Sequence, residues 1–454
     1  MVDLISRSPS SLQAPIPLFG VTWSDEELYV YGGGGSKFGI QSGVYVFQPD
    51  ENALASEANG QSPLRIQTFD VLYKRKVFCS SDETIWNLVR LYTHPPVGGE
   101  NSFMAATPKG FRSIVSNCCE DVDFPGKKVK RQLDQIKSCM AIGPLSSQES
   151  PVPEDTQPAK TLLVLTWSIQ GNPFYGVFHC ASVKNRKSPS ISLQKLDSTP
   201  AFDLIKHTIA QLESTGKSKQ PTGEINDIAL IQINSERQML LCAAVYELQF
   251  QSGQKSACVS IFEINATGRI VPLHSLAYTL AKSTRSTKCF WLTDGPCPIL
   301  GTIQISPAGS FLRSFALMNT YRLEETHCHL LTTEKTTACC VFQYDGNQHL
   351  AFGTASGQVL IFSLEPIRLI RRVTSYDSPI TGLAVRSTGF PVIAITHLCG
   401  MLCLHTIMEA PHVLQPRTWV VAAALYICFI ALCTTYSLWD TVCALSATSD
   451  ALKG

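Results

Sequence analysis

The chain has 454 residues, of which 37 are lysine or arginine and 36 are aspartate or glutamate. This nearly neutral balance excludes a protein that binds nucleic acid or an acidic lipid surface through its bulk charge. Seventeen cysteines are present, but Cys118 and Cys119 are adjacent and the spacing of Cys399 and Cys403 is not that of a zinc ribbon. We expect reduced, mostly apolar cysteines in a cytosolic body.

The N-terminal part alternates short apolar segments with turns. The pattern predicts strands over residues 19–23, 28–31 and 43–47. Between the second and third of these strands lies the segment GGGGSKFGIQSG, residues 32–43, which we call the glycine hairpin.

The glycine hairpin is not a nucleotide cradle. Lys37 follows Ser36 and precedes Phe38, whereas a P-loop needs Gly-Lys followed by Ser or Thr. Residues without side chains allow the backbone to fold tightly and to point its carbonyl oxygens inward, a geometry that holds an alkali cation or meets another protein closely. The alternative interpretation is an ordinary flexible hairpin loop.

Short apolar strands continue beyond the first three. They are predicted over residues 161–169, 173–180, 227–233, 239–246, 257–264, 299–306, 309–318, 339–342 and 381–385. Two insertions, 144–160 and 213–222, are too polar to bury a core.

Two segments near the C-terminal end repeat each other. Residues 348–362 (QHLAFGTASGQVLIF) align with 391–405 (PVIAITHLCGMLCLH), so Gly357 matches Gly400 and Phe362 matches His405 at a period of 43 residues. This is the period of a WD-repeat blade. Allowing for the insertions, we predict an all-β, seven-bladed WD-repeat-like β-propeller over residues 1–408, with a pair of smaller β domains as the alternative.

A propeller must protect its sheet edges. We therefore expect the extreme N-terminal strand to pair with the last strand, near residues 402–407, and so close the ring.

The segment 418–439 contains no charged residue. A helix over 419–439 would be about 31 Å long, which matches a bilayer core of ~30 Å, and Trp419 and Trp439 would lie at its two ends. We predict a linker at 409–418, a single transmembrane helix at 419–439 and a short lumenal tail at 440–454. Arg417 before the helix and Asp440 after it favour a cytosolic N-terminal domain. The alternative is a buried core helix.

Other polar clusters have simpler interpretations than a site. His327 and His329 flank Cys328 without a second cluster at metal spacing, so we interpret them as ordinary strand residues. The basic run at 127–131 follows acidic residues and is interpreted as a solvated loop. The sequence shows no catalytic set, so we expect no covalent chemistry.

In its glycine hairpin and in its overall plan, the chain resembles the membrane-anchored WD-repeat guanine-nucleotide exchange factors of the endoplasmic reticulum, the prolactin regulatory element-binding protein family. Members carry four glycines, a short spacer, Gly-Ile and then Gly-Val, which stand here as residues 32–35, 39–40 and 43–44. The resemblance implies a guanine-nucleotide exchange factor in the endoplasmic reticulum membrane. Its partner would be the small GTPase that initiates assembly of the COPII coat.

The resemblance also assigns roles within the hairpin. It implies that Ile40, Gln41 and Ser42 contact the GTPase. It implies that backbone carbonyls hold a potassium ion, from Gly34, Gly35, Ser36, Lys37 and Gly39. Animal members have Asn at the position of Ser42 and a spacer one residue longer.

Exchange would need no covalent step, because the factor binds the nucleotide-free GTPase more tightly than the loaded one. Two other classes stay open. One is a membrane-anchored propeller that acts as a scaffold or tether in vesicle traffic without exchange activity. The other is a transcriptional regulator, which the neutral charge and the anchor disfavour.

Overall fold

The structure is a computed structural model, and it describes residues 6–8, 11–14, 16–24, 27–34, 40–49, 71–80, 84–85, 87–91, 102–107, 110–115, 118–121, 133–142, 161–169, 172–184, 189–212, 221–233, 239–250, 253–265, 267–293, 297–344, 346–364, 366–386 and 392–407. The predicted linker 409–418, transmembrane helix 419–439 and tail 440–454 lie outside these residues. So do the basic run at 127–131 and the insertion at 144–160. The chain separates into two units, Met1–Gln61 with Ile66–Thr406 and Ser62–Arg65 with Ile407–Gly454, and every described strand belongs to the first.

The described residues form antiparallel sheets, so the all-β prediction is confirmed. The first two sheets contain β3 (Leu18–Ser24), β4 (Glu27–Gly32), β5 (Ser42–Pro49) and β6 (Val71–Ser80), then β7 (Asn87–Leu91), β8 (Ser102–Thr107), β9 (Gly110–Val115) and β10 (Cys118–Asp121). The next two contain β11 (Leu133–Ile142), β12 (Thr161–Ile169), β13 (Asn172–Lys184) and β14 (Pro189–Pro200), then β15 (Thr222–Ile233), β16 (Met239–Gln249), β17 (Lys255–Ile264) and β18 (Ile270–Thr279).

Three further sheets complete the described part of the chain. Two contain β19 (Arg285–Thr293), β20 (Ile299–Ser306), β21 (Gly309–Leu317) and β22 (Leu323–Thr332), then β23 (Thr336–Tyr344), β24 (Asn347–Thr354), β25 (Gln358–Leu364) and β26 (Ile367–Thr374). The final sheet combines β27 (Ile380–Val385), β28 (Val392–His397) and β29 (Met401–Thr406) with β1 (Ser6–Ser8) and β2 (Ser11–Gln13).

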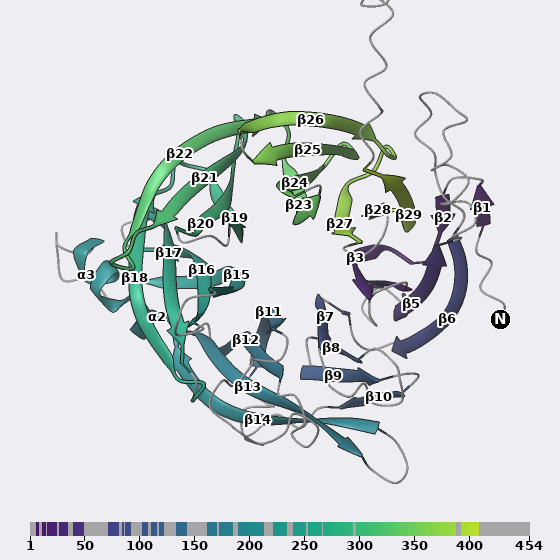
Figure 1. Ribbon diagram of the computed structural model, residues 1–454, viewed down its shortest axis with the longest axis horizontal. Coiled ribbons are helices and arrows are strands. Elements are labelled where there is room, and N and C mark those ends of the chain that lie inside the picture. The colour runs from purple at the N-terminus through teal and green to yellow at the C-terminus, as the bar shows by residue number, and fades with distance from the viewer. Residues whose placement is uncertain are drawn as a thin grey trace, which may run out of the picture. The chain divides into compact units, whose positions relative to one another are not determined.

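The first strands of successive sheets contact one another in a closed ring. The contacts run from β3 through β7, β11, β15, β19, β23 and β27 and return from β27 to β3. Figure 1 shows these strands around the centre of the first unit and the later strands of each sheet farther out. This is the arrangement of a β-propeller.

The N-terminal strand closes the ring as predicted. Strand β2 pairs antiparallel with β29, with Leu12 opposite Leu402 and Gln13 opposite Met401. The first and last described strands of the unit therefore belong to one sheet, which protects an edge that β29 would otherwise expose.

The core lies between neighbouring sheets, and β16 shows why its strands are almost continuously apolar. Successive side chains of a strand point to opposite faces. Tyr246 and Cys242 join a cluster with residues of β13, whereas Leu241 and Val245 join a separate cluster with residues of β19 and β21. Both faces of the sheet are covered, so both sets of side chains are apolar.

Several strands, including β6 and β11, and two short helices lie where the sequence pattern predicted no element. Helices α2 (Ala201–Leu204) and α3 (Lys206–Leu212) connect β14 to β15, and Ala201, Ile205 and Ile209 join the core cluster of the β15–β18 sheet. Their spacing of four residues was the available helical signal. Among the described residues, no helix has the length and apolar character needed to cross a bilayer.

Candidate functional site

The glycine hairpin connects β4 to β5, and its first two glycines are required by the backbone around them. Gly32 pairs with Gly43, and a Cβ at Gly32 would lie 2.0 Å from the carbonyl oxygen of Pro17. The N–H of Gly33 donates to that same oxygen at 2.9 Å. Gly33 has a φ of 126°, and its Cβ would lie 2.3 Å from the Cα of Ser42. The base of the hairpin is therefore packed too closely for any side chain.

The three predicted GTPase contacts differ in exposure. Gln41 is exposed, whereas the side chain of Ser42 is fully buried and its hydroxyl finds no partner among the described residues. The resemblance implies that Ile40 is an exposed apolar contact, but its side chain is half-buried against an apolar cluster that includes Leu18 and Leu402. That cluster joins the first sheet to the last, so Ile40 ties the hairpin to both.

The predicted potassium ligands lie mostly outside the described residues. Gly34 is described and half-buried, but Gly35, Ser36, Lys37 and Gly39 are not described. Within the described ranges, no group of three or more His, Cys, Asp or Glu side chains could hold a metal ion. His327 and His329 lie on exposed positions of β22 with their rings 5.4 Å apart.

The two sheets before the first sheet in the ring are the β23–β26 sheet and the final sheet. Each has a short turn, between β24 and β25 or between β28 and β29, where the first sheet has the glycine hairpin. The N–H of Gly33 donates to Pro17, that of Leu398 to Pro379 at 2.9 Å, and that of Ala355 to Lys335 at 3.0 Å. Each acceptor is the residue immediately before the first strand of its sheet. Gly33, Leu398 and Ala355 are therefore equivalent positions, as the sequence repeat also indicates for the last two.

Backbone hydrogen bonds also join these turns to the segments beside them. The N–H of Ala14 donates to Gly400 at 2.8 Å, and the N–H of Ser375 donates to Gly357 at 3.1 Å. The two glycines match in the repeat and have φ values of 84° at Gly357 and 90° at Gly400. The hairpin base, the turn after β28 and the turn after β24 thus form one continuous backbone network.

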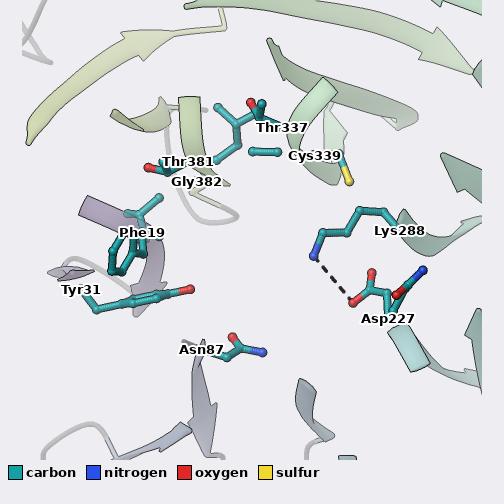
Figure 2. Close-up of a pocket in the computed structure, with 14 residues that line it drawn as sticks. Phe19, Tyr31, Asn87, Asp227, Lys288, Thr337, Cys339, Thr381 and Gly382 are labelled. Atoms are coloured by element: carbon teal, nitrogen blue, oxygen red, sulfur yellow. Dashed lines mark ion pairs between the residues drawn. The ribbon is translucent and has the colours of Figure 1, made fainter. Parts of the chain in front are cut away.

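A second candidate site is a cavity of about 230 Å³ at the ring centre, lined by first strands of several sheets. Figure 2 shows Tyr31 and Lys288 pointing into this space from different sides. The Lys288 ammonium lies 3.8 Å from a carboxylate oxygen of Asp227, whose other oxygen accepts the backbone N–H of Cys289 at 3.1 Å. The sequence pattern did not predict this pair, because β15 and β19 each carry other polar and charged residues, and nothing in the sequence links these two positions.

The electrostatics of the cavity favour an ion pair over a catalytic group. The Asp227 carboxylate raises the pKa of Lys288 above its ordinary value, which keeps the ammonium charged. Burial raises the pKa of Asp227, and the Lys288 ammonium opposes this. Burial also raises the pKa of the Cys339 thiol to about 12, so this cavity-lining cysteine is a poor nucleophile at neutral pH.

Comparisons with known proteins show only distant similarity. No family model matches the chain, and no curated protein matches it in sequence. It is similar to the crystal structure of the Cps50 (Swd1) β-propeller domain of Myceliophteria thermophila, with a TM-score of 0.45 and 12% identity over 90% of this chain and 99% of that one. It is also similar to the computationally designed protein Ika8, with a TM-score of 0.40 and 11% identity over 88% and 98% of the two chains.

Proposed function

We propose that this protein is a guanine-nucleotide exchange factor for the small GTPase that initiates COPII coat assembly, and that it acts through the glycine hairpin. The observation that carries the proposal is the form of the hairpin. In the β23–β26 sheet and in the final sheet, a turn of three residues suffices at this position, whereas the first sheet has residues 33–41 there. A loop of nine residues on a tightly packed base is long enough to reach into the nucleotide site of a partner.

The mechanism would be differential binding. Gly32, Gly33 and the buried Ser42 fix the two ends of the hairpin, and Ile40 packs against the core. These fixed ends reduce the conformational entropy that their residues lose when the partner binds. A hairpin that fits only the nucleotide-free GTPase would lower the affinity of the GTPase for GDP. By linkage, GDP would weaken the binding of the GTPase to this protein by the same factor.

Several further features belong to the same proposal. The sheets would be the blades of a seven-bladed WD-repeat-like propeller, and residues 419–439 would anchor it in the endoplasmic reticulum membrane with the propeller in the cytosol. Carbonyls of Gly34 and neighbouring hairpin residues would bind potassium. Anchoring would restrict activation of the GTPase to the membrane on which the coat assembles.

The test is the release of fluorescent GDP from the coat GTPase, with the full chain in detergent micelles and in potassium or sodium buffer. We expect the wild-type chain to accelerate release. The variant Gln41→Ala should reduce the acceleration about tenfold, because it removes an exposed hairpin side chain. Ile40→Ala should reduce it at least as much, and its melting temperature must be compared with that of wild type because Ile40 packs against the core.

Leu330→Ala is the matched control, since Leu330 is an exposed residue of the outer strand β22. Release at the wild-type rate is expected for this variant. A folded wild-type chain that leaves GDP release unchanged would overturn the exchange function and favour the scaffold alternative. A requirement for potassium would support the ion site, and equal rates in sodium would exclude a catalytic role for it.

A further inference from the structure

Two large apolar side chains are exposed close together on loops of the final sheet. Tyr376, before β27, is 46% exposed, and Leu398, after β28, is 45% exposed. The N–H of Leu398 donates to Pro379, and the rings of Tyr376 and His397 are 6.0 Å apart in an edge-to-face contact. We call these two residues the Tyr376–Leu398 patch.

The turn does not require a leucine at position 398. Ala355 occupies the equivalent position in the β23–β26 sheet and donates the same backbone hydrogen bond. The turn geometry depends on the glycine that follows, Gly357 or Gly400, and not on the side chain before it. The apolar side chain of Leu398 therefore has no role in the local fold that alanine could not fill.

The patch is connected to the base of the glycine hairpin. Two residues after Leu398, the carbonyl oxygen of Gly400 accepts the N–H of Ala14 at 2.8 Å. Three residues after Ala14, the carbonyl oxygen of Pro17 accepts the N–H of Gly33 at 2.9 Å. The half-buried Ile40 packs against a cluster that contains residues of both the first and the last sheet.

The glycine hairpin alone is too small to form a complete protein interface. A specific interface buries about 800 Å² on each partner and involves about 20–30 residues a side. The glycine hairpin has only 12 residues, 32–43, and some of its side chains face the core. A GTPase bound to the hairpin must therefore also contact neighbouring surface, and the final sheet is joined directly to the hairpin base.

We propose that the Tyr376–Leu398 patch is part of the binding surface for the same small GTPase and contacts an apolar region of it. This inference rests on the proposed function, because it extends the contact that the hairpin makes. The patch adds affinity for the nucleotide-free GTPase, while the hairpin displaces the nucleotide.

The test measures two quantities on the full chain in detergent micelles, namely the affinity for immobilised nucleotide-free GTPase and the rate of GDP release. Leu398→Ala introduces the residue found at the equivalent position 355, so the fold should be retained. Leu398→Ala and Tyr376→Ala should each weaken binding about tenfold, the effect of losing an apolar anchor at an interface. GDP release at subsaturating concentrations of the protein should slow in proportion. Leu330→Ala, an exposed leucine on β22, is the control and should bind as wild type does.

The outcomes separate the two proposals. If wild type binds and exchanges while both patch variants match it, the patch inference is overturned and the exchange function stands. If wild type binds without accelerating GDP release, the exchange function fails, and the affinities of the variants decide the patch alone. If wild type does not bind the nucleotide-free GTPase, both proposals are overturned.

Discussion

The β23–β26 sheet and the final sheet of the ring follow one backbone plan, but most of their aligned side chains differ. Both place a glycine with positive φ in the turn after their second strand, at Gly357 and Gly400. Where the first has Phe362, the final sheet has His405. The shared backbone is therefore set by the glycines and by the hydrogen bonds around them. Side chains that this backbone does not use, including Leu398, are open to other roles.

The glycines provide the strongest test of this comparison. A Cβ at Gly357 would lie 1.6 Å from the carbonyl oxygen of Tyr376, and one at Gly400 would lie 2.7 Å from that of Ile16. We expect Gly357→Ala to lower the free energy of unfolding by about 3 kcal/mol or more, because it combines a positive φ with a backbone clash. Gly400→Ala should follow with a smaller loss, and urea unfolding measures both.

Gly346→Ala is the matched control within the β23–β26 sheet. Gly346 also has a positive φ, of 74°, but no atom lies within 4 Å of the position of a Cβ there. We expect a loss of only about 1 kcal/mol, the cost of the left-handed conformation alone. Equal losses at Gly346 and Gly357 would show that the close approach of the Tyr376 carbonyl oxygen does not add to the cost of Gly357→Ala.

His405, which stands where the β23–β26 sheet has Phe362, should make stability depend on pH. Its side chain is 4% exposed, and neither ring nitrogen has a hydrogen-bond partner in the described part of the chain. Burial, helped by the charge of Arg371, lowers the pKa of His405 to about 4. The folded state therefore holds this imidazole neutral, whereas the unfolded chain takes up a proton below pH 6.5. Stability should rise with pH from about 4 to 6.5 and fall as the solution is acidified through that range.

His405→Phe introduces the residue of the aligned position 362 and should remove this effect. We expect the loss of stability between pH 7 and pH 4 to be smaller than in wild type by about 3 kcal/mol. Stability at pH 7 should also rise, because two buried unpaired nitrogens are removed. Urea unfolding at a series of pH values measures both effects. His327→Phe, at an exposed position of β22, is the control, and its profile should follow that of wild type.

The smallest effect should come from exchanging the exposed side chains between the two turns. Ala355 and Leu398 donate equivalent hydrogen bonds from the backbone, so Ala355→Leu and Leu398→Ala should each change stability by less than about 0.5 kcal/mol. Thermal unfolding of the two variants measures this. A loss of more than about 1 kcal/mol in Leu398→Ala would show that the leucine side chain stabilises the turn after β28.

The features that the sequence predicted depend on local pattern and on the repeat. Strands β12 and β20 have the predicted bounds, and the pairing of β2 with β29 was expected from the need to close the ring. The two helices were not predicted, because α2 and α3 are too short for a strong helical pattern. The central ion pair was not predicted because it joins Asp227 to Lys288 across two sheets. The packing of Ile40 depends on a cluster that includes Leu402, far along the chain.

The pairing of β2 with β29 also sets an order of events during synthesis. Residues 11–13 are made more than 380 residues before their partner strand, residues 401–406. Throughout translation the N-terminal strands lack the sheet that they complete, and the growing chain ends in an open sheet edge that can pair with other chains. Completion of β29 is therefore the step at which the ring becomes a closed and protected unit. A chain that ends before residue 401 would retain most of its sheets and yet expose two edges.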